Sequence, residues 1–266
     1  MKREKLAAVF FAAVTMLVFA ASAGAADGTI EINQAKVLAN GGFPYTIGTG
    51  SYRLTGNLTV PSGTNGINVN AANVTIDLNG FSIIGPLTTL TSATPIGIDA
   101  FEILVTVENG IVTGFGTGVE VGGGGIIRNV HVDGNFNGIE ASNNSVVTGC
   151  TANNGNVGGT GIACAATCTI SGNTANGDGA GGITCGGDAC VISGNTASDD
   201  GVGIHCKGSG CLISGNTVTS AGTYPIEASD ATTGYGGNVL AGLVVSLGGT
   251  SFGNNVCTTL SGTVIC

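Results

Sequence analysis

The chain has 266 residues, of which 49 are glycine, 42% are apolar and 9% are charged, and its formal net charge is −9. Glycine at more than twice its average share of about 7% excludes helical bundles, because each glycine destabilises a helix by about 1 kcal/mol. The three-residue period of collagen is missing, and the apolar content is too high for a disordered chain. The acidic surface repels phosphate backbones, which disfavours nucleic-acid binding. These facts leave an all-β architecture rich in turns.

The first 25 residues have the pattern of a secretory signal peptide. A basic start at residues 2–5 precedes an apolar run over 6–21, and the small residues 23–25 form a cleavage site. The run is shorter than the roughly 20 residues of a membrane span. All nine cysteines follow this segment, as expected in an oxidising compartment. We therefore expect a secreted protein, extracellular or periplasmic, with no membrane insertion once residues 1–25 are removed.

A repeat organises residues 45–237. Three near-identical copies begin at Thr169, Val191 and Leu212, each followed by Ile-Ser-Gly-Asn-Thr, and they set a period of about 21 residues. Apolar positions within the repeats alternate with period two, which predicts short strands. A unit this small cannot close a sheet alone, so neighbouring units must stack at ~4.8 Å and bury a shared apolar column. The repeat predicts a parallel β-helix of about nine coils.

Both ends of such a solenoid expose unpaired strand edges, so caps are expected. Residues 26–44 are predicted to form the N-terminal cap, because Ile32 to Leu38 has the spacing of a short amphipathic helix. Residues 238–266 break the repeat and are predicted to form a last coil and the C-terminal cap.

Two inward columns follow from the register of the repeat. One takes an aliphatic residue from each coil: Ile67, Ile98, Val119, Ile139, Ile162, Ile183, Ile204 and Ile226. The other is a partial asparagine ladder at a bend, formed by Asn173, Asn195 and Asn216. Each amide there can satisfy the turn backbone of the neighbouring coil. Val130 and Cys150 hold the same position in earlier coils.

Several segments carry a resemblance to a known group of proteins: residues 51–60, 73–85, 127–132 and the three Ile-Ser-Gly-Asn-Thr runs. Over residues 45–235 the chain resembles the right-handed parallel β-helix proteins with pectate-lyase-like coils, of the bacterial secreted type. The resemblance implies the fold and the right-handed coil. It carries little about function, because these coil motifs are structural, and the Asn-Thr-Asp, Gly-His-Gly and Arg-Ile-Lys motifs of the related polygalacturonases are missing.

Six cysteines form three pairs that keep the register of the repeat and bracket the same turn: Cys164 and Cys168, Cys185 and Cys190, Cys206 and Cys211. A bridge within each coil is favoured because it fits every pair. The alternative links neighbouring coils, since stacked strands bring Cα atoms within the bridging range of about 4.4–6.8 Å.

The three remaining cysteines lie outside these pairs. Cys257 and Cys266 are predicted to close the C-terminal segment with a further disulfide. Cys150 is left over at the inward ladder position, so it is predicted to be a buried and inert free thiol.

Three successive coils place a carboxylate on the strand that carries the aliphatic column, at the outward position that follows it. These residues, Asp99, Glu120 and Glu140, should stand ~5 Å apart. Like charges so close raise one another's pKa or recruit a cation. The row is interpreted either as a Ca²⁺ site or acid/base pair for glycan cleavage, or as plain solvated surface. Arg128 and His131, on a second outward row, are candidate catalytic partners.

A third acidic group lies in the turn before the aliphatic column. Asp178 and Asp199 are one repeat apart and Asp200 is adjacent, which makes these three residues candidates for Ca²⁺ binding. Asp and Gly in a tight turn also occur without any ligand.

Together these patterns predict a secreted protein with a structural or binding role, whose partner would be a polysaccharide or a cell-surface glycan. The alternative is a polysaccharide lyase or glycoside hydrolase that uses the acidic row with Arg128 or His131. Ca²⁺ is the candidate cofactor, and the sequence leaves the oligomeric state open.

Overall fold

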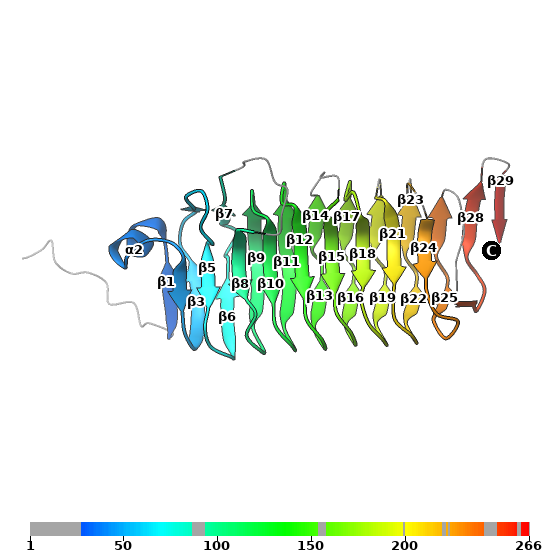
Figure 1. Ribbon diagram of the computed structural model, residues 1–266, viewed down its shortest axis with the longest axis horizontal. Coiled ribbons are helices and arrows are strands. Elements are labelled where there is room, and N and C mark those ends of the chain that lie inside the picture. The colour runs from blue at the N-terminus through cyan, green and yellow to red at the C-terminus, as the bar shows by residue number, and fades with distance from the viewer. Residues whose placement is uncertain are drawn as a thin grey trace, which may run out of the picture.

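The computed structural model describes residues 28–86, 94–153, 158–198, 200–219, 222, 224–241, 249–259 and 262–265. These residues form a parallel β-solenoid of about nine turns with almost no helix (Figure 1). The all-β parallel β-helix predicted from the repeat is thereby confirmed. The predicted signal peptide, residues 1–25, lies outside the described residues.

One wall of the solenoid is a parallel sheet with one strand from each coil. Its nine strands are β2 (Tyr45–Ile47), β5 (Ile67–Val69), β8 (Ile96–Ala100), β10 (Thr117–Val121), β12 (Asn137–Ala141), β15 (Thr160–Cys164), β18 (Gly181–Cys185), β21 (Val202–Cys206) and β24 (Tyr224–Ala228).

The other two walls belong to one twenty-stranded sheet that bends along its length. The first wall contains β1 (Thr29–Ile32), β3 (Gly50–Leu54), β6 (Val74–Asp77), β13 (Val146–Thr148), β16 (Thr169–Ser171), β19 (Val191–Ser193), β22 (Leu212–Ser214), β25 (Gly234–Gly236) and β27 (Thr250–Ser251). The second contains β4 (Leu58–Thr59), β7 (Ser82–Ile84), β14 (Thr151–Asn153), β17 (Thr174–Asn176), β20 (Thr196–Ser198), β23 (Thr217–Thr219), β26 (Val239–Ala241), β28 (Val256–Thr259) and β29 (Gly262–Ile265). Two longer strands, β9 (Thr106–Thr113) and β11 (Ile126–Asp133), run across both walls.

Strand pairing between coils is offset by one repeat, so equivalent residues stack. The aliphatic column predicted from the sequence is in register, for example Ile98 with Val119 and Val119 with Ile139. All eight of its members are buried. Alternate residues point outward, which fixes the identity of every outward row once the register is known.

The asparagine ladder occupies the bend between the two walls of the twenty-stranded sheet. The Asn173 amide Nδ2 donates to Val147 O at 2.9 Å and to Asn195 Oδ1 at 3.0 Å, and the Asn173 backbone N also donates to Asn195 Oδ1. The pattern repeats through Asn216 and continues beyond the predicted members to Asn238 and Asn255. The preceding glycine makes the sharp bend, as Gly194 does at φ 64°.

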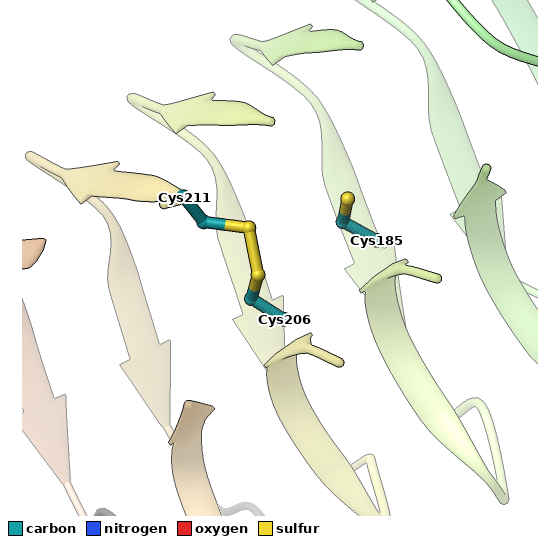
Figure 2. Close-up of side chains that lie close together, drawn as sticks. All are labelled: Cys185, Cys206 and Cys211. Atoms are coloured by element: carbon teal, nitrogen blue, oxygen red, sulfur yellow. A yellow bond between two sulfur atoms is a disulfide. The ribbon is translucent and has the colours of Figure 1, made fainter. Parts of the chain in front are cut away.

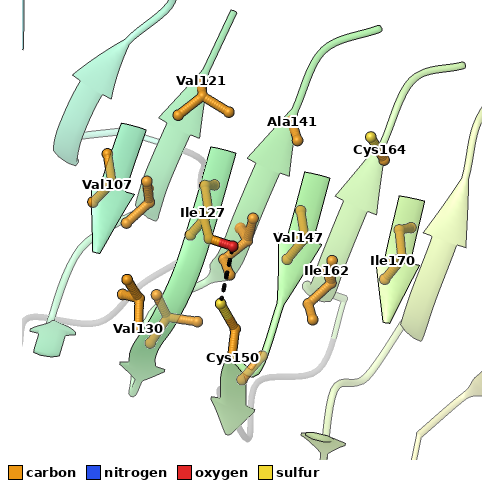
Figure 3. Close-up of a cluster of buried hydrophobic side chains, with 14 of the residues drawn as sticks. Val107, Val121, Ile127, Val130, Ala141, Val147, Cys150, Ile162, Cys164 and Ile170 are labelled. Atoms are coloured by element: carbon orange, nitrogen blue, oxygen red, sulfur yellow. Dashed lines mark hydrogen bonds between the residues drawn. The ribbon is translucent and has the colours of Figure 1, made fainter. Parts of the chain in front are cut away.

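Cys150 lies where the ladder gives way to an apolar core. Its backbone N donates to Asn173 Oδ1 at 2.9 Å, while its Sγ lies 3.7 Å from Ile127 O (Figure 3). The side chain is buried and is a free cysteine, as the sequence predicted. Val130 takes the same position one coil earlier, so the bend is filled by apolar side chains on that side.

Short elements occupy the two ends of the solenoid (Figure 1). Helix α2 (Gln34–Ala39) starts two residues later than the predicted cap helix, because the Asn33 side chain caps it by accepting from Lys36 N at 3.0 Å. Strand β1 precedes the helix and already pairs parallel with β3. At the other end β28 pairs parallel with β26, and β29 pairs antiparallel with β28.

Candidate functional site

The predicted acidic row lies on the outer face of the nine-stranded sheet. Glu120 on β10 is in register with Asp99 on β8 and with Glu140 on β12. Asparagine amides hold the two outer carboxylates: Asn65 Nδ2 donates to Asp99 Oδ2 at 3.2 Å, and Asn137 Nδ2 donates to Glu140 Oε1 at 2.7 Å.

Glu120 sits between these two acids without such an amide. Among the hydrogen bonds of the described residues, none reaches its carboxylate. Burial, and then the charges of Glu140 and Asp99, raise the pKa of Glu120 above its ordinary value. A cation placed at this point would lower the pKa of Glu120, because its charge would offset the repulsion and favour the ionised form.

A pocket of about 270 Å³ opens beside the row. Glu120 and Glu140 form the charged part of its lining. In the next coil the same outward position holds the small Ala163, which leaves the space that the pocket occupies. Phe101, which is 64% exposed, forms its apolar edge. The pocket therefore combines negative charge with an aromatic surface.

Arg128 and His131 lie elsewhere, on β11 of the twenty-stranded sheet. Arg128 forms an ion pair with Glu108, its neighbour in register on β9. His131 lines a second pocket of about 240 Å³ together with Asp133. The structure does not bring these two residues to the acidic row, so the predicted combination of the row with Arg128 or His131 is not formed.

The candidate Ca²⁺ ligands in the turn are largely inside the fold. Asp178 and Asp200 are buried, and the Asp178 backbone N donates to Asp200 Oδ1 at 2.9 Å. The buried Asn135 makes the same kind of contact two coils earlier, accepting from Phe115 N at 2.9 Å. The two acids thus belong to a polar column that holds the turns together. Asp199 lies outside the described residues, and Ca²⁺ binding here stays a prediction.

The disulfides lie within single coils. Cys164–Cys168, Cys185–Cys190 and Cys206–Cys211 are the three bridges, with Cα–Cα distances of 6.4, 6.4 and 6.6 Å. Cys257 is also disulfide-bonded, and its predicted partner Cys266 lies outside the described residues. Burial raises the pKa of the remaining Cys150 thiol to about 11, so this side chain stays protonated and unreactive near neutral pH.

Sulfur atoms of adjacent coils also come close together. The Sγ atoms of Cys185, Cys206 and Cys211 all lie within 4.8 Å of one another (Figure 2), and all three residues are buried. The sequence indicated the register of the pairs, yet it did not indicate that the second and third bridges converge.

The sequence analysis did not single out a polar group formed by His205, Glu227 and Ser229. His205 Nε2 lies 3.8 Å from Glu227 Oε1 and 3.3 Å from Ser229 Oγ. Burial lowers the pKa of His205, with Lys207 acting in the same direction and Glu227 against it. The available signal was that His205 and Glu227 occupy the same outward row one repeat apart.

The fold defines a class of protein: an extended all-β parallel β-solenoid of about nine turns. The family model described as "Periplasmic copper-binding protein (NosD)" matches residues 96–242, which is more than half of the chain. The chain therefore belongs to the NosD family. No curated protein and no protein of solved structure matches it.

The periplasmic location of this family agrees with the export expected from the sequence. Across the part of the chain that the structure describes, no helix combines the length and apolarity that a membrane span requires. The family and the fold support a periplasmic binding or structural role.

Proposed function

We propose that this protein is a periplasmic binding solenoid that receives a basic side chain of a partner protein in the pocket beside Glu120. The observation that carries the proposal is the position of Glu120 between Asp99 and Glu140, in register with both and with a raised pKa. Three carboxylates in line are unfavourable without a counter-charge, and an entering cation relieves the repulsion.

The shape of the pocket specifies the kind of cation. The aromatic edge at Phe101 suits the aliphatic stem and planar head of an arginine, which stacks on aromatic rings. Glu120 and Glu140 then accept hydrogen bonds from the guanidinium, whose fork geometry matches carboxylates. A bare metal ion would leave the apolar edge unused.

The description of the NosD family names copper as a ligand. The acidic row is a poor fit for it, because copper prefers imidazole and sulfur ligands over carboxylates alone. Among the described residues, His131 and His205 lie on different sheets. The Sγ atoms of Cys185, Cys206 and Cys211 lie within 4.8 Å of one another, but all three residues belong to disulfides and so offer no thiolate to copper.

Glycan binding is a second candidate, favoured by a hydroxyl ladder on the twenty-stranded sheet. Thr151, Thr174, Thr196 and Thr217 are in register from β14 to β23. Such a regular row suits a linear polymer of hydroxylated units. The enzymatic alternative is not favoured, since Arg128 and His131 lie away from the carboxylates and the family is described by binding.

Fluorescence anisotropy with a labelled peptide of alternating leucine and arginine tests the proposal. We expect saturable binding that weakens at least tenfold in the Glu120→Gln/Glu140→Gln variant. The Glu108→Gln/Asp133→Asn variant loses the same charge from the other sheet and should bind as the wild type does.

A peptide with citrulline in place of arginine keeps the shape and loses the charge, so it should not bind. Equal binding of both peptides, or of the wild type and the Glu120→Gln/Glu140→Gln variant, would exclude the proposed site. Retention of the wild-type protein on an insoluble polysaccharide, with no peptide binding, would favour the glycan candidate instead.

A further inference from the structure

We infer that the partner segment carries aliphatic side chains beside its arginine, and that these pack on an apolar corner formed by Phe101, Ile103 and Leu104. The inference rests on the proposed function, because the corner adjoins the pocket that receives the arginine. It specifies the partner further, as a stretch of protein chain that is both basic and apolar.

The apolar corner is the turn that follows β8. Two fully buried residues, Ala100 and Val105, flank it, and the four residues between them are all exposed. Phe101 is 64% exposed, Ile103 56% and Leu104 52%. Because both flanks are fixed in the core, three large apolar side chains meet solvent within four consecutive positions.

The equivalent turns of the other coils have a different composition. The register of the nine-stranded sheet aligns the apolar corner with residues 70–73, 122–125, 142–145, 165–167, 186–189, 207–210 and 229–232. These turns consist of small and polar residues. The solenoid therefore closes this turn without large apolar side chains, and the fold does not require them at residues 101–104. A contiguous exposed apolar patch indicates an interaction surface.

Backbone hydrogen bonds hold the apolar corner in place. Leu104 N donates to Gly123 O at 3.0 Å, and Ile103 O accepts from Asn73 N at 3.3 Å. Leu104 has φ 58°, a left-handed conformation that is rare for leucine. A turn that is already ordered loses little conformational entropy when a partner binds.

The apolar corner leans toward the strand that carries the central carboxylate of the acidic row. A Cβ on Gly124, in the turn after β10, would lie 2.9 Å from Leu104 Cδ2, and a Cβ on Gly123 would lie 3.9 Å from Ile103 Cγ2. Phe101 belongs to the corner and also lines the pocket. The apolar side chains and the carboxylates thus form one continuous face.

The charge around the apolar corner selects the occupant. Glu102 is exposed within the turn itself, and Glu120 and Glu140 line the adjoining pocket. An anionic bilayer would be repelled by this face. A second copy of the chain, with its formal net charge of −9, would be repelled as well. Apolar surface beside negative charge is complementary to a segment in which aliphatic residues stand beside arginine.

Two labelled peptides, compared by fluorescence anisotropy, test the inference. The first has one arginine with a leucine two residues to either side, so that the three side chains share one face of an extended chain. The second has serine in place of both leucines. We expect the wild type to bind the leucine peptide at least tenfold more tightly than the serine peptide, and this comparison does not depend on any variant.

The Ile103→Ser/Leu104→Asn variant removes the part of the apolar corner that lies outside the pocket. Asparagine replaces Leu104 because it tolerates a positive φ. This variant should bind both peptides equally. Val191→Ser/Leu212→Ser is the matched control, since it removes two side chains of the other sheet that are 37% and 42% exposed. It should keep the tenfold preference, and circular dichroism checks that both variants fold.

The outcomes separate this inference from the proposed function. Equal binding of both peptides by the wild type would overturn the inference and leave the arginine pocket in place. If neither peptide binds, the proposed function fails and the inference fails with it. A preference that survives in the Ile103→Ser/Leu104→Asn variant, or disappears in the control as well, would also overturn the inference.

Other occupants of the apolar corner have their own signature. Binding of the wild type to phosphatidylglycerol vesicles would assign the corner to a lipid surface, if the Ile103→Ser/Leu104→Asn variant abolishes it. Self-association in sedimentation that the same variant abolishes would assign the corner to a second copy of the chain. Either result would overturn the inference.

Discussion

The early and late coils build the same solenoid corners from different chemistry. In the early coils the turn after the nine-stranded sheet is filled by Val121 and Ala141, and the bend holds Val130. In the late coils the corresponding turn position is cysteine and the bend is asparagine, as in Cys185 and Asn195. The early coils are thus held by apolar packing, and the late coils by amide hydrogen bonds and covalent bridges.

The difference shows what a small repeat needs when its core side chains become smaller. The column that holds Val112 and Val132 on β9 and β11 becomes Ala152, Ala175 and Ala197 in the following coils. Alanine buries less apolar area than valine. Each buried methylene contributes about 0.8 kcal/mol to stability, so these coils lose hydrophobic stabilisation. The ladder and the disulfides occupy the same stretch of chain and offset that loss.

The largest effect should come from breaking the ladder in its middle with Asn195→Leu. The leucine cannot accept from Asn173 N or donate to Ile170 O. Each buried polar group left without a partner costs about 1–3 kcal/mol, so we expect a loss of about 3 kcal/mol or more. Urea unfolding measures it. The exposed Asn153→Leu should change the unfolding free energy by no more than about 0.5 kcal/mol, and equal losses would refute the structural role of the ladder.

Removing one covalent bridge should have an intermediate effect. Closing a loop of this size contributes about 2 kcal/mol in the chain-entropy model, so Cys206→Ala/Cys211→Ala should lower the unfolding free energy by about that amount. Alanine fits this place, since Ala228 occupies the next position in register. Guanidinium unfolding of the oxidised proteins measures the loss, and no change would show that the late coils do not need the bridge.

Extending the ladder by one step with Cys150→Asn should sharpen the comparison. The new amide could donate to Asn173 Oδ1 and to Ile127 O, which already lies 3.7 Å from the Cys150 sulfur. One added buried hydrogen bond contributes about 1 kcal/mol. Urea unfolding should therefore show a gain of about 1 kcal/mol, whereas Cys150→Ala, which only removes atoms, should show a loss. A loss in both variants would mean that the apolar core resists the amide.

The smallest effect concerns the acidic row of the early coils. The raised pKa of Glu120 means that the folded chain holds this proton more tightly than the unfolded chain. The resulting contribution to stability is present below the unfolded pKa and is lost as the pH rises through the folded pKa. Glu120→Gln should therefore melt slightly above the wild type at about pH 7, with a difference that vanishes at about pH 4.

Thermal melts at both pH values check this prediction, with Glu108→Gln as control. That carboxylate is paired with Arg128, so its loss should not raise the melting temperature. A difference for Glu120→Gln that stays the same at both pH values would show that the pKa of Glu120 is not the cause.

Periodicity explains how much the sequence could predict. The period alone placed Asp99, Glu120 and Glu140 in register. It favoured a bridge between Cys185 and Cys190 inside one coil over a bridge between coils, and the structure has the bridge inside the coil. The sequence could not predict how deeply individual side chains are buried or where a turn directs them, because spacing does not say how far a side chain enters the core.

Three particulars show that limit. The burial of Asp178 and Asp200 is decided by how the turn folds over neighbouring glycines, which spacing does not reveal. The ladder continues to Asn255 across a step of 17 residues, shorter than the repeat that identified the other members. The pocket depends on the exposed Phe101, which belongs to a loop outside the repeating positions.

The antiparallel pairing of β29 on β28 has a consequence for polymer growth. Stacked parallel coils invite indefinite end-to-end addition, because each last rung is a template for the next. Here β29 runs antiparallel to β28 on one wall, so a strand added beside β29 would not find the parallel register that the internal coils share. At the other end, α2 stands where a preceding molecule would dock (Figure 1). The antiparallel strand β29 and the helix α2 thus both disfavour end-to-end association into fibres.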